Sequence, residues 1–452
     1  MRLLVSLCLV IAADAATVAE YQILQRGADG KASARFEGQT ATASVIEIEA
    51  RRGSWTRKTK IKVSPGPWSG EVDGLETGGP YRIEARNGAE RIVRDNIYVG
   101  DLWVLAGQSN MVGRAKFSGA ESPDDRVHVL PKDSIWAVAK EPVHELRTGL
   151  DGEPIGAGLG LPFAKEMVRR TGVPIGLLPV AVGGTSLWQW EPDDPKSLYA
   201  AMMDRIRKAG GKVRGVLWHQ GEADSRDDRS PQYAGKFQYF LTALRRDLKD
   251  DRLSFYYAQV SRYPFEEKPP RSARSLNRIQ ETQRLLEENI KGIRMAATID
   301  LELEDHVHLN REGQHRLGRR LANLACRDLF PNISECASVL PGPRLSGVRW
   351  ESPRHLRVIF TGVNGALRST GRVLGFSFTD GDGKEQPLIF RASLAGGSGN
   401  EVVLQINNQL GFPAALRLWY GRGFDPTCNL TGDRDMAVPV FGPLLVTPPP
   451  AK

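Results

Sequence analysis

The chain carries the stretch Leu105-Ala106-Gly107-Gln108-Ser109-Asn110-Met111 at the end of an apolar run that begins at Leu102. Such a run is typical of a buried strand, and Gly107 permits a tight turn where the strand ends. The pattern therefore predicts Ser109 at the carboxyl end of a strand, where open α/β sheets hold their ligands. A serine there becomes a nucleophile when a base reaches its hydroxyl. Taken alone, the stretch favours a simpler interpretation, in which Ser109 caps the following helix.

Three later stretches reverse that preference, because each follows a predicted strand and each supplies a part that acyl transfer needs. They are Val182-Gly183-Gly184-Thr185, His219-Gln220-Gly221-Glu222 and Asp305-His306-Val307-His308-Leu309-Asn310. Since the carboxyl ends of parallel strands meet at one edge of a sheet, we expect these stretches to lie near Ser109.

On these residues the chain resembles the sialate O-acetylesterase family of carbohydrate esterases, within the SGNH-hydrolase superfamily. The resemblance rests on Gly107-Gln108-Ser109-Asn110-Met111, Gly183-Gly184-Thr185 with Trp190, Gln220-Gly221-Glu222 with Asp224, and Asp305 with His308. Weaker similarity extends to Gly78-Gly79-Pro80, Gly100-Asp101-Leu102-Trp103, Arg417-Leu418-Trp419-Tyr420 and Cys428-Asn429-Leu430. The resemblance implies a three-layer α/β/α SGNH-type domain with a parallel sheet, and a serine esterase that needs no cofactor.

A serine hydroxyl needs a base within hydrogen-bond reach, and His308 is our candidate. Asp305 precedes it by three residues, a spacing that lets one turn of loop bring the carboxylate to the Nδ1 proton. Nε2 would then face Ser109. In the resembled family the residues that match Ser109, Asp305 and His308 form this triad. Met111 occupies the second glycine position of a Gly-x-Ser-x-Gly elbow, which argues against the α/β-hydrolase fold.

The tetrahedral intermediate needs hydrogen-bond donors directed at its oxyanion. We expect the backbone N–H of Ser109 to be one. The Gly183-Gly184 pair lets a backbone approach closely and offers a second, for which we name Gly184. The side-chain amide of Gln220 is the third candidate, since the resembled family uses glutamine at this step. The alternative for the glycine pair is an ordinary tight turn.

Further residues near these motifs are candidates for binding substrate. We assign Gln108, Asn110 and Glu222 to this group because they flank the predicted catalytic parts. Trp188 and Trp190 would stack on a sugar ring, with core or rim packing as an equal alternative. Glu222 and Asp224 also fit a carboxylate pair for glycosidic cleavage, although anchoring of the loop is the simpler interpretation.

The histidines allow roles other than that of the catalytic base. His306 and His308 with Asp305 would suit a metal ion, but the sequence offers no clear third ligand nearby, so we predict no metal. His219 is a rival base, although a histidine beside a strand end is more often structural. His315 fits a structural role on its helix.

The chain has 452 residues with ordinary globular composition, and its patterns divide it into several parts. Short alternating runs predict an antiparallel β domain over 16–98. Strands alternate with helical patterns over 99–335, which predicts the parallel sheet with helices on both faces. The expected strands are Leu102–Leu105, Pro174–Val182, Val213–Trp218, Leu253–Val260 and Arg294–Ile299, and the expected helices are Leu161–Arg170, Tyr233–Leu248, Leu276–Asn289 and Glu312–Cys326. Alternating runs return over 340–447 and predict a second antiparallel β domain.

Residues 1–15 read as a secretory signal, with Arg2 before an apolar run and Ala13-Asp14-Ala15 as a small-x-small cleavage site. We therefore expect a secreted or periplasmic protein, with no membrane span. In an oxidising compartment a Cys326–Cys336 disulfide is one expectation, and three buried thiols, with Cys428, are the alternative. The net charge of +8 comes from scattered basic pairs on predicted helices, and no nucleic-acid motif accompanies it.

The motifs predict a serine esterase, and the resemblance implies that it removes O-acetyl groups from a carbohydrate through an acetyl-Ser109 intermediate. The alternatives are another SGNH esterase, such as a xylan or pectin deacetylase or a lipid or aryl esterase, and a carbohydrate-binding protein with an inactive site. The sequence specifies neither the acetylated sugar nor the oligomeric state.

Overall fold

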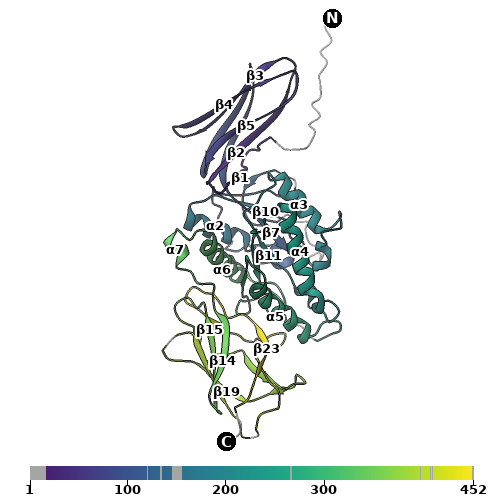
Figure 1. The fold of residues 1–452 in the computed structure, drawn as a ribbon, viewed down its shortest axis with the longest axis vertical. Coiled ribbons are helices and arrows are strands. Elements are labelled where there is room, and N and C mark those ends of the chain that lie inside the picture. Colours follow the sequence, from purple (N-terminus) through teal and green to yellow (C-terminus); the bar gives the residue numbers. More distant parts are fainter. Residues whose placement is uncertain are drawn as a thin grey trace.

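A computed structural model of the chain describes residues 17–119, 121–132, 135–144, 155–264, 267–397, 399–407, 409 and 411–449. The molecule is elongated, with a β domain at each end and a domain of strands and helices between them (Figure 1). The predicted signal segment at residues 1–15 lies outside the described residues.

The central domain is built on a sheet with the order β13-β12-β11-β7-β10-β8-β9. Its strands are β7 (Glu90–Gly107), β8 (Val127–Val129), β9 (Ala137–Val138), β10 (Ile175–Pro179), β11 (Gly215–His219), β12 (Ser254–Ala258) and β13 (Ile293–Ala296). Neighbouring strands run parallel from β13 to β8, and β9 alone pairs in the antiparallel sense. The predicted fold class is therefore confirmed.

Two helical layers cover the faces of this sheet (Figure 1). One layer holds α3 (Leu198–Lys208), α4 (Tyr233–Leu248) and α5 (Ala273–Asn289), and the other holds α2 (Gly160–Thr171) and α6 (Arg311–Leu329). Successive side chains of β7 face opposite layers, as the strand geometry requires. Leu102, Val104 and Ala106 join the core of the first layer, while Trp103 and Leu105 join that of the second.

The predicted strands and helices of this domain match the structure closely, but α3 and the edge strands β8 and β9 were not predicted. Helix α3 buries Tyr199, Met202 and Ile206 at helical spacing, and it also buries the charged Arg205. That charge on the inward face weakens the apolar pattern on which sequence interpretation depends. The strands β8 and β9 contain three and two residues, too few to show a period.

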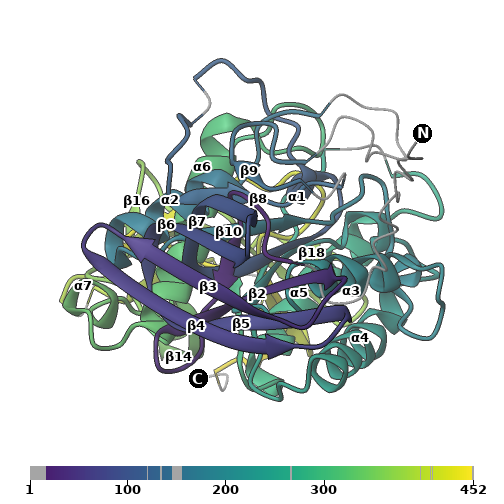
Figure 2. The same ribbon diagram turned by 90° about the horizontal axis from the view of Figure 1, so that it is seen from above.

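The N-terminal β domain consists of β1 (Ile23–Gln25), β2 (Lys31–Thr40), β3 (Ser44–Arg52), β4 (Trp55–Val63), β5 (Gly66–Glu76) and β6 (Gly78–Asn87), together with the first half of β7. Figure 2 shows this domain in front of the central sheet. Strand β6 pairs with β7 as far as Val99, and β10 pairs with β7 from Asp101 onward. One continuous strand therefore joins the two domains, and its change of partner falls between Val99 and Asp101.

The C-terminal β domain contains β14 (Arg344–Ser352), β15 (His355–Thr361), β16 (Arg368–Ser369), β17 (Phe376–Thr379), β18 (Glu385–Gln386), β19 (Ile389–Leu394), β20 (Glu401–Ile406), β21 (Leu416–Tyr420), β22 (Leu430–Thr431) and β23 (Phe441–Val446). All its ladders are antiparallel. Gln259, which follows β12, exchanges two 2.9 Å hydrogen bonds with the backbone of Val440 and ties this domain to the central one.

Two further sequence-based expectations concern the cysteines and the membrane. Cys326 at the end of α6 forms a disulfide with Cys336 in α7 (Ser334–Ala337), as one of the two open interpretations held, and Cys428 is a buried free thiol. Among the helices that the structure describes, none is long and apolar enough to cross a membrane.

Candidate active site

The end of β7 places Ser109 between two neighbouring strands. Gly107 has a φ of +130°, and a Cβ there would lie 2.1 Å from the carbonyl oxygen of His219, so only glycine fits this turn. Gln108 is the N-cap of the short helix α1 (Ser109–Val112), and Ser109 is its first residue. The simpler interpretation of Ser109 as the cap is therefore wrong, and the hydroxyl stands at the carboxyl edge of the sheet.

The predicted triad residues lie within hydrogen-bond distance of one another. Ser109 Oγ is 2.9 Å from Nε2 of His308, and Nδ1 of His308 is 2.7 Å from Oδ2 of Asp305. Because Nδ1 donates to the carboxylate, Nε2 accepts the serine proton. The other carboxylate oxygen of Asp305 accepts the backbone N–H groups of Val307 and His308 at 2.8 Å each, which fixes the loop.

The ionisation of Asp305 suits an orienting carboxylate. Partial burial tends to raise its pKa, but hydrogen bonds from the His308 ring and from two backbone N–H groups outweigh that effect and hold the pKa below its usual value. Asp305 therefore stays charged at neutral pH. A charged carboxylate holds the imidazole in the correct tautomer and stabilises the imidazolium that forms during acyl transfer.

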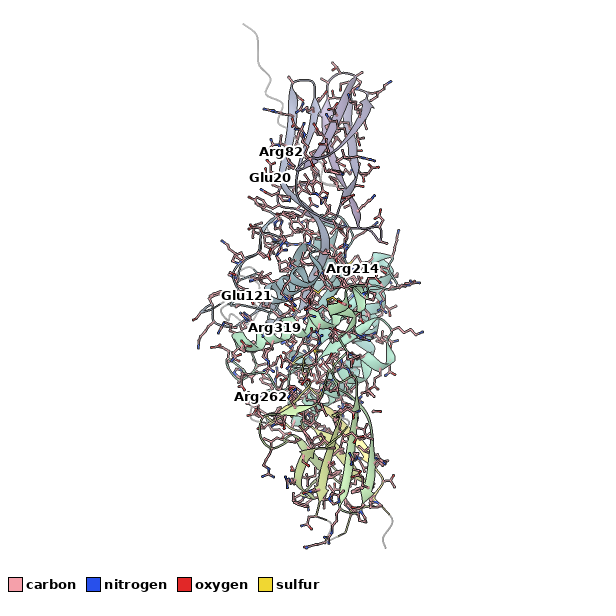
Figure 3. The ribbon with its side chains drawn as sticks, turned by 90° about the vertical axis from the view of Figure 1, so that its left-hand side faces the viewer. Glu20, Arg82, Glu121, Arg214, Arg262 and Arg319 are labelled. Carbon is pink, nitrogen blue, oxygen red and sulfur yellow. A yellow bond between two sulfur atoms is a disulfide. The ribbon has the colours of Figure 1, made fainter. Side chains whose placement is uncertain are left out.

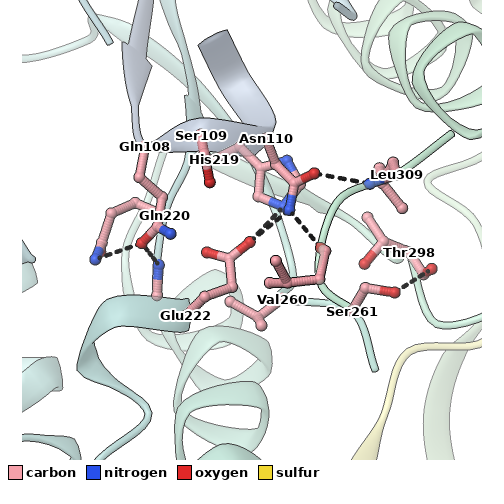
Figure 4. Close-up of polar contacts among 12 residues, drawn as sticks. Gln108, Ser109, Asn110, His219, Gln220, Glu222, Val260, Ser261, Thr298 and Leu309 are labelled. Carbon is pink, nitrogen blue, oxygen red and sulfur yellow. Dashed lines mark hydrogen bonds and ion pairs between the residues drawn. The ribbon is translucent and has the colours of Figure 1, made fainter. Parts of the chain in front are cut away.

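Asn110 contacts protein groups rather than open space, which corrects its assignment to substrate binding. The side chain is 0% exposed. Its amide nitrogen donates to Glu222 Oε1 at 2.7 Å and to the carbonyl of Val307 at 3.1 Å, and its oxygen accepts the N–H of Leu309 at 3.0 Å (Figure 4). Asn110 is thus a positioning residue that fastens the loop of His308 to the turn that carries Ser109.

Gln108 also has a positioning role. Its side chain is 4% exposed, and its oxygen accepts the N–H of Ala223 at 3.2 Å and that of Gly221 at 3.4 Å (Figure 4). These bonds join the turn after β7 to the turn after β11. Through its side-chain oxygen Gln108 therefore holds two loops of the site together, and a role for its amide nitrogen in substrate binding stays a prediction.

The oxyanion role predicted for Gln220 does not fit the structure. This side chain is 0% exposed, and its amide nitrogen donates to Asp224 Oδ2 at 2.6 Å and to the carbonyl of Thr185 at 3.3 Å. Its oxygen accepts the hydroxyl of Tyr233 at 3.2 Å. Because both amide protons are directed at protein acceptors, Gln220 supports its loop instead of donating to an intermediate.

The backbone donors predicted for the oxyanion remain available. In the part of the chain that the structure describes, the N–H groups of Ser109 and Gly184 donate to no protein acceptor. Ser109 begins α1, where the first N–H groups of a helix lack intrahelical partners. Gly184 is exposed and has a φ of +72°, a conformation that favours glycine.

This arrangement changes the result that we expect from substituting Gln220. Gln220→Ala should lower Tm by several degrees, because the buried Asp224 carboxyl and Tyr233 hydroxyl each lose one hydrogen bond, at a cost of about 0.5–1.5 kcal/mol each. Thermal unfolding and kcat should be measured together, with the exposed Gln232→Ala as a control. A hundredfold fall in kcat at wild-type Tm would instead restore the oxyanion role.

His219, which ends β11, and the carboxylates Glu222 and Asp224 that follow it are structural. Glu222 is 4% exposed and accepts from Asn110. Burial raises the pKa of Asp224 to about 6, and its Oδ2 accepts the backbone N–H of Leu187 as well as the Gln220 amide. This pair therefore does not face a glycosidic bond. His219 is wholly buried, and burial lowers its pKa, so it is no rival to His308 as the base.

Trp188 and Trp190 differ in their burial. Trp190 is 0% exposed and packs edge-on against Trp218 at 5.1 Å, in the core of the α3–α4 layer, so its assignment to sugar stacking is wrong. Trp188 is half-buried, with the cations of Arg229 and Lys236 at 5.7 Å and 5.3 Å from its ring centroid. A role for Trp188 in substrate binding stays a prediction.

No group of three His, Cys, Asp or Glu side chains among the described residues is arranged to hold a metal ion. His306 is exposed and stacks on Tyr263, with ring centroids 5.8 Å apart. His315 on α6 is 7% exposed, and burial lowers its pKa.

Sequence interpretation missed Gln283, which supports the backbone of Gln220. Gln283 on α5 donates to the carbonyl of Gln220 at 2.9 Å and accepts the N–H of Val260 at 2.8 Å. The available signal was the spacing of Leu276, Ile279 and Gln283 on one face of the helix, which places a polar side chain among apolar ones. A buried amide at such a position needs partners.

Comparisons with known proteins agree with this site. The model of the family described as carbohydrate esterase, sialic acid-specific acetylesterase matches residues 99–327. A probable carbohydrate esterase of Arabidopsis thaliana is 29% identical over 259 residues, which cover 51% of this chain and 92% of that protein. The sialate O-acetylesterase of Homo sapiens is 22% identical over 251 residues, which cover 45% of this chain and 47% of that protein.

A carbohydrate acetylesterase of Xanthomonas citri has a similar structure, with a TM-score of 0.72 and 21% identity, over 94% of this chain and 98% of that one. At this identity the likeness shows the fold, which includes both terminal β domains. The chain spans about half the length of the human relative that it matches. The family match covers half of this chain and all the motifs around Ser109, and it confirms the predicted class of carboxylic ester hydrolase. The chain belongs to the carbohydrate esterase, sialic acid-specific acetylesterase family.

Proposed function

We propose that this protein removes O-acetyl groups from a carbohydrate through a covalent acetyl-Ser109 intermediate. The observation that carries the proposal is the relay from Ser109 Oγ to His308 Nε2, at 2.9 Å, and from His308 Nδ1 to Asp305, at 2.7 Å. Family membership supports O-acetyl ester hydrolysis. The relay identifies the atoms that would perform it.

In the first half of the reaction, Ser109 Oγ attacks the acetyl carbonyl carbon while His308 Nε2 takes the hydroxyl proton. The charged Asp305 stabilises the resulting imidazolium. The oxyanion forms next to the N–H groups of Ser109 and Gly184. Neither N–H group donates to a protein acceptor within the described residues. When the intermediate collapses, the bond to the sugar oxygen breaks, and His308 returns its proton to that oxygen.

In the second half, water takes the place of the sugar hydroxyl. His308 accepts a proton from the water as its oxygen attacks the acetyl carbon. Collapse of the second intermediate breaks the bond to Ser109 Oγ, which recovers the proton from His308, and acetate leaves. The side chains therefore return to their starting protonation states, and no step requires an oxidant, a reductant or a bound cofactor.

The substrate class can be tested by acetate release. We expect the purified protein to hydrolyse a chromogenic acetyl ester and to release acetate from at least one member of a panel of acetylated glycans, with sialic acid and xylan among them. Turnover of the chromogenic ester without release from any glycan would favour a lipid or aryl esterase. No turnover of any ester would contradict the proposal and favour a carbohydrate-binding protein.

We further propose that the protein is exported to an oxidising compartment. The Cys326–Cys336 disulfide supports this, because disulfides persist mainly in secreted and periplasmic proteins. The pattern of a positive residue, an apolar run and a small-x-small site at residues 1–15 also supports it.

A further inference from the structure

A small pocket lies away from the active site, between the helices α2 and α6 and the turn before β23. It has a volume of about 170 Å³ and is lined by Arg170, Arg319, Arg320, Asn323, Arg434 and Asp435. Arg319 lies on the central part of the molecule in Figure 3. Four arginines therefore surround this pocket with only one carboxylate among its walls, and like charges at such short range repel one another.

Asp435, the carboxylate in the pocket wall, already accepts hydrogen bonds from two arginines. Asp435 accepts hydrogen bonds from Arg316 and from Arg320, at 2.5 Å and 3.0 Å to the same oxygen. Arg320 is 1% exposed and also binds Asp300 through two bonds of 2.8 Å and 2.6 Å. These contacts join α6 to the C-terminal domain. They neutralise Arg320, but they do not neutralise Arg170, Arg319 and Arg434, the other arginines of the pocket.

Arg434 is the pocket cation for which the described residues offer no acidic partner. It is half-buried, its one side-chain bond in the described structure goes to the hydroxyl of Ser338 at 2.9 Å, and no described carboxylate lies within ion-pair distance. Arg319 is 44% exposed, and its ion pair among the described residues is with the exposed Glu312, at 3.2 Å. Arg170 is 7% exposed and pairs with Glu166, yet one of its terminal nitrogens is buried without a partner. A buried cationic donor of this kind calls for an acceptor.

We propose that this arginine pocket binds a small dianionic oxyanion, of which inorganic phosphate is the chemical type. The pocket is smaller than the roughly 300 Å³ at which ligand pockets for organic molecules begin, and guanidinium groups match the geometry of phosphate oxygens. The buried Oδ1 of Asn323 has no donor in the structure, and the remaining proton of hydrogen phosphate supplies one. The anion would join α2 and α6 to the turn at 434–435 and so hold the C-terminal domain in place.

Thermal unfolding of the full chain tests this proposal. About 20 mM phosphate should raise Tm by about 1–3 °C relative to sodium chloride at equal ionic strength, because a ligand that binds only the folded state stabilises it. Isothermal titration calorimetry with phosphate should show one binding site per chain.

Substitutions in the pocket separate specific binding from a general salt effect. Arg434→Ala and Arg319→Ala should each abolish the phosphate-dependent rise in Tm, while Arg354→Ala, at an exposed position of the same C-terminal domain, should retain it. None of these residues lies in the active site, so hydrolysis of a chromogenic acetyl ester should be unchanged. An equal rise in Arg434→Ala, or no phosphate-specific rise in the wild type, would each overturn the proposal.

Discussion

Ser109→Ala is expected to lower kcat for a chromogenic acetyl ester by at least about a thousandfold, because it removes the only atom that forms the covalent bond. Among the described residues the hydroxyl makes one hydrogen bond, at 2.9 Å to His308 Nε2, so its loss should cost about 0.5–1.5 kcal/mol of stability and leave the protein folded. The measurement is steady-state kinetics with thermal unfolding of the same preparation.

A serine outside the site provides the matched control. Ser393→Ala, on β19 of the C-terminal domain, should keep wild-type kcat and wild-type Tm. Wild-type turnover by Ser109→Ala would end the assignment of the nucleophile. An unfolded Ser109→Ala protein would be distinguished by its lost unfolding transition, in which case Ser109→Cys would be measured in its place.

The second large effect concerns the base, and the chain offers a matched pair of histidines in one loop. His308→Ala should lower kcat by about a thousandfold or more, because no other described side chain lies within hydrogen-bond distance of Ser109 Oγ. His306→Ala should lower it by less than about tenfold, since that ring is exposed and stacks on Tyr263. Initial rates on the chromogenic ester, normalised to folded protein, give the comparison.

The reverse ranking of these two variants would contradict the triad. The same preparations also test the metal alternative that the sequence left open for His306, His308 and Asp305. A chelator should leave wild-type activity unchanged. Inhibition that added zinc reverses would instead favour a metal site in this loop.

The sequence was informative where function depends on local pattern. The apolar run before Gly107 predicted a buried strand, and β7 indeed alternates its side chains between the two helical layers. The spacing of Asp305 and His308 predicted a carboxylate–imidazole contact that one loop can make by itself, and the two atoms lie 2.7 Å apart. Each of these interpretations needed only a few consecutive residues.

Sequence interpretation failed where the role of a side chain depends on contacts between distant segments. Asn110 and Glu222 are 112 positions apart, and a 2.7 Å hydrogen bond joins their buried side chains. The buried side chain of Gln220 donates hydrogen bonds to Asp224 and to the carbonyl of Thr185. Trp190 follows a loop motif, yet it is covered by α4 through Phe240. No local pattern distinguishes a polar or aromatic side chain that faces substrate from one that supports the loop.

The central claim is that Ser109 becomes acylated, and covalent labelling tests it most directly. The protein should be inactivated with a serine-reactive phosphonate, digested, and analysed by mass spectrometry of its peptides, with His308→Ala treated in parallel. We expect a single adduct on Ser109 that appears in step with the loss of activity, and little or no adduct in His308→Ala. Complete inactivation with the adduct on another residue, or full activity after quantitative labelling of Ser109, would contradict the account.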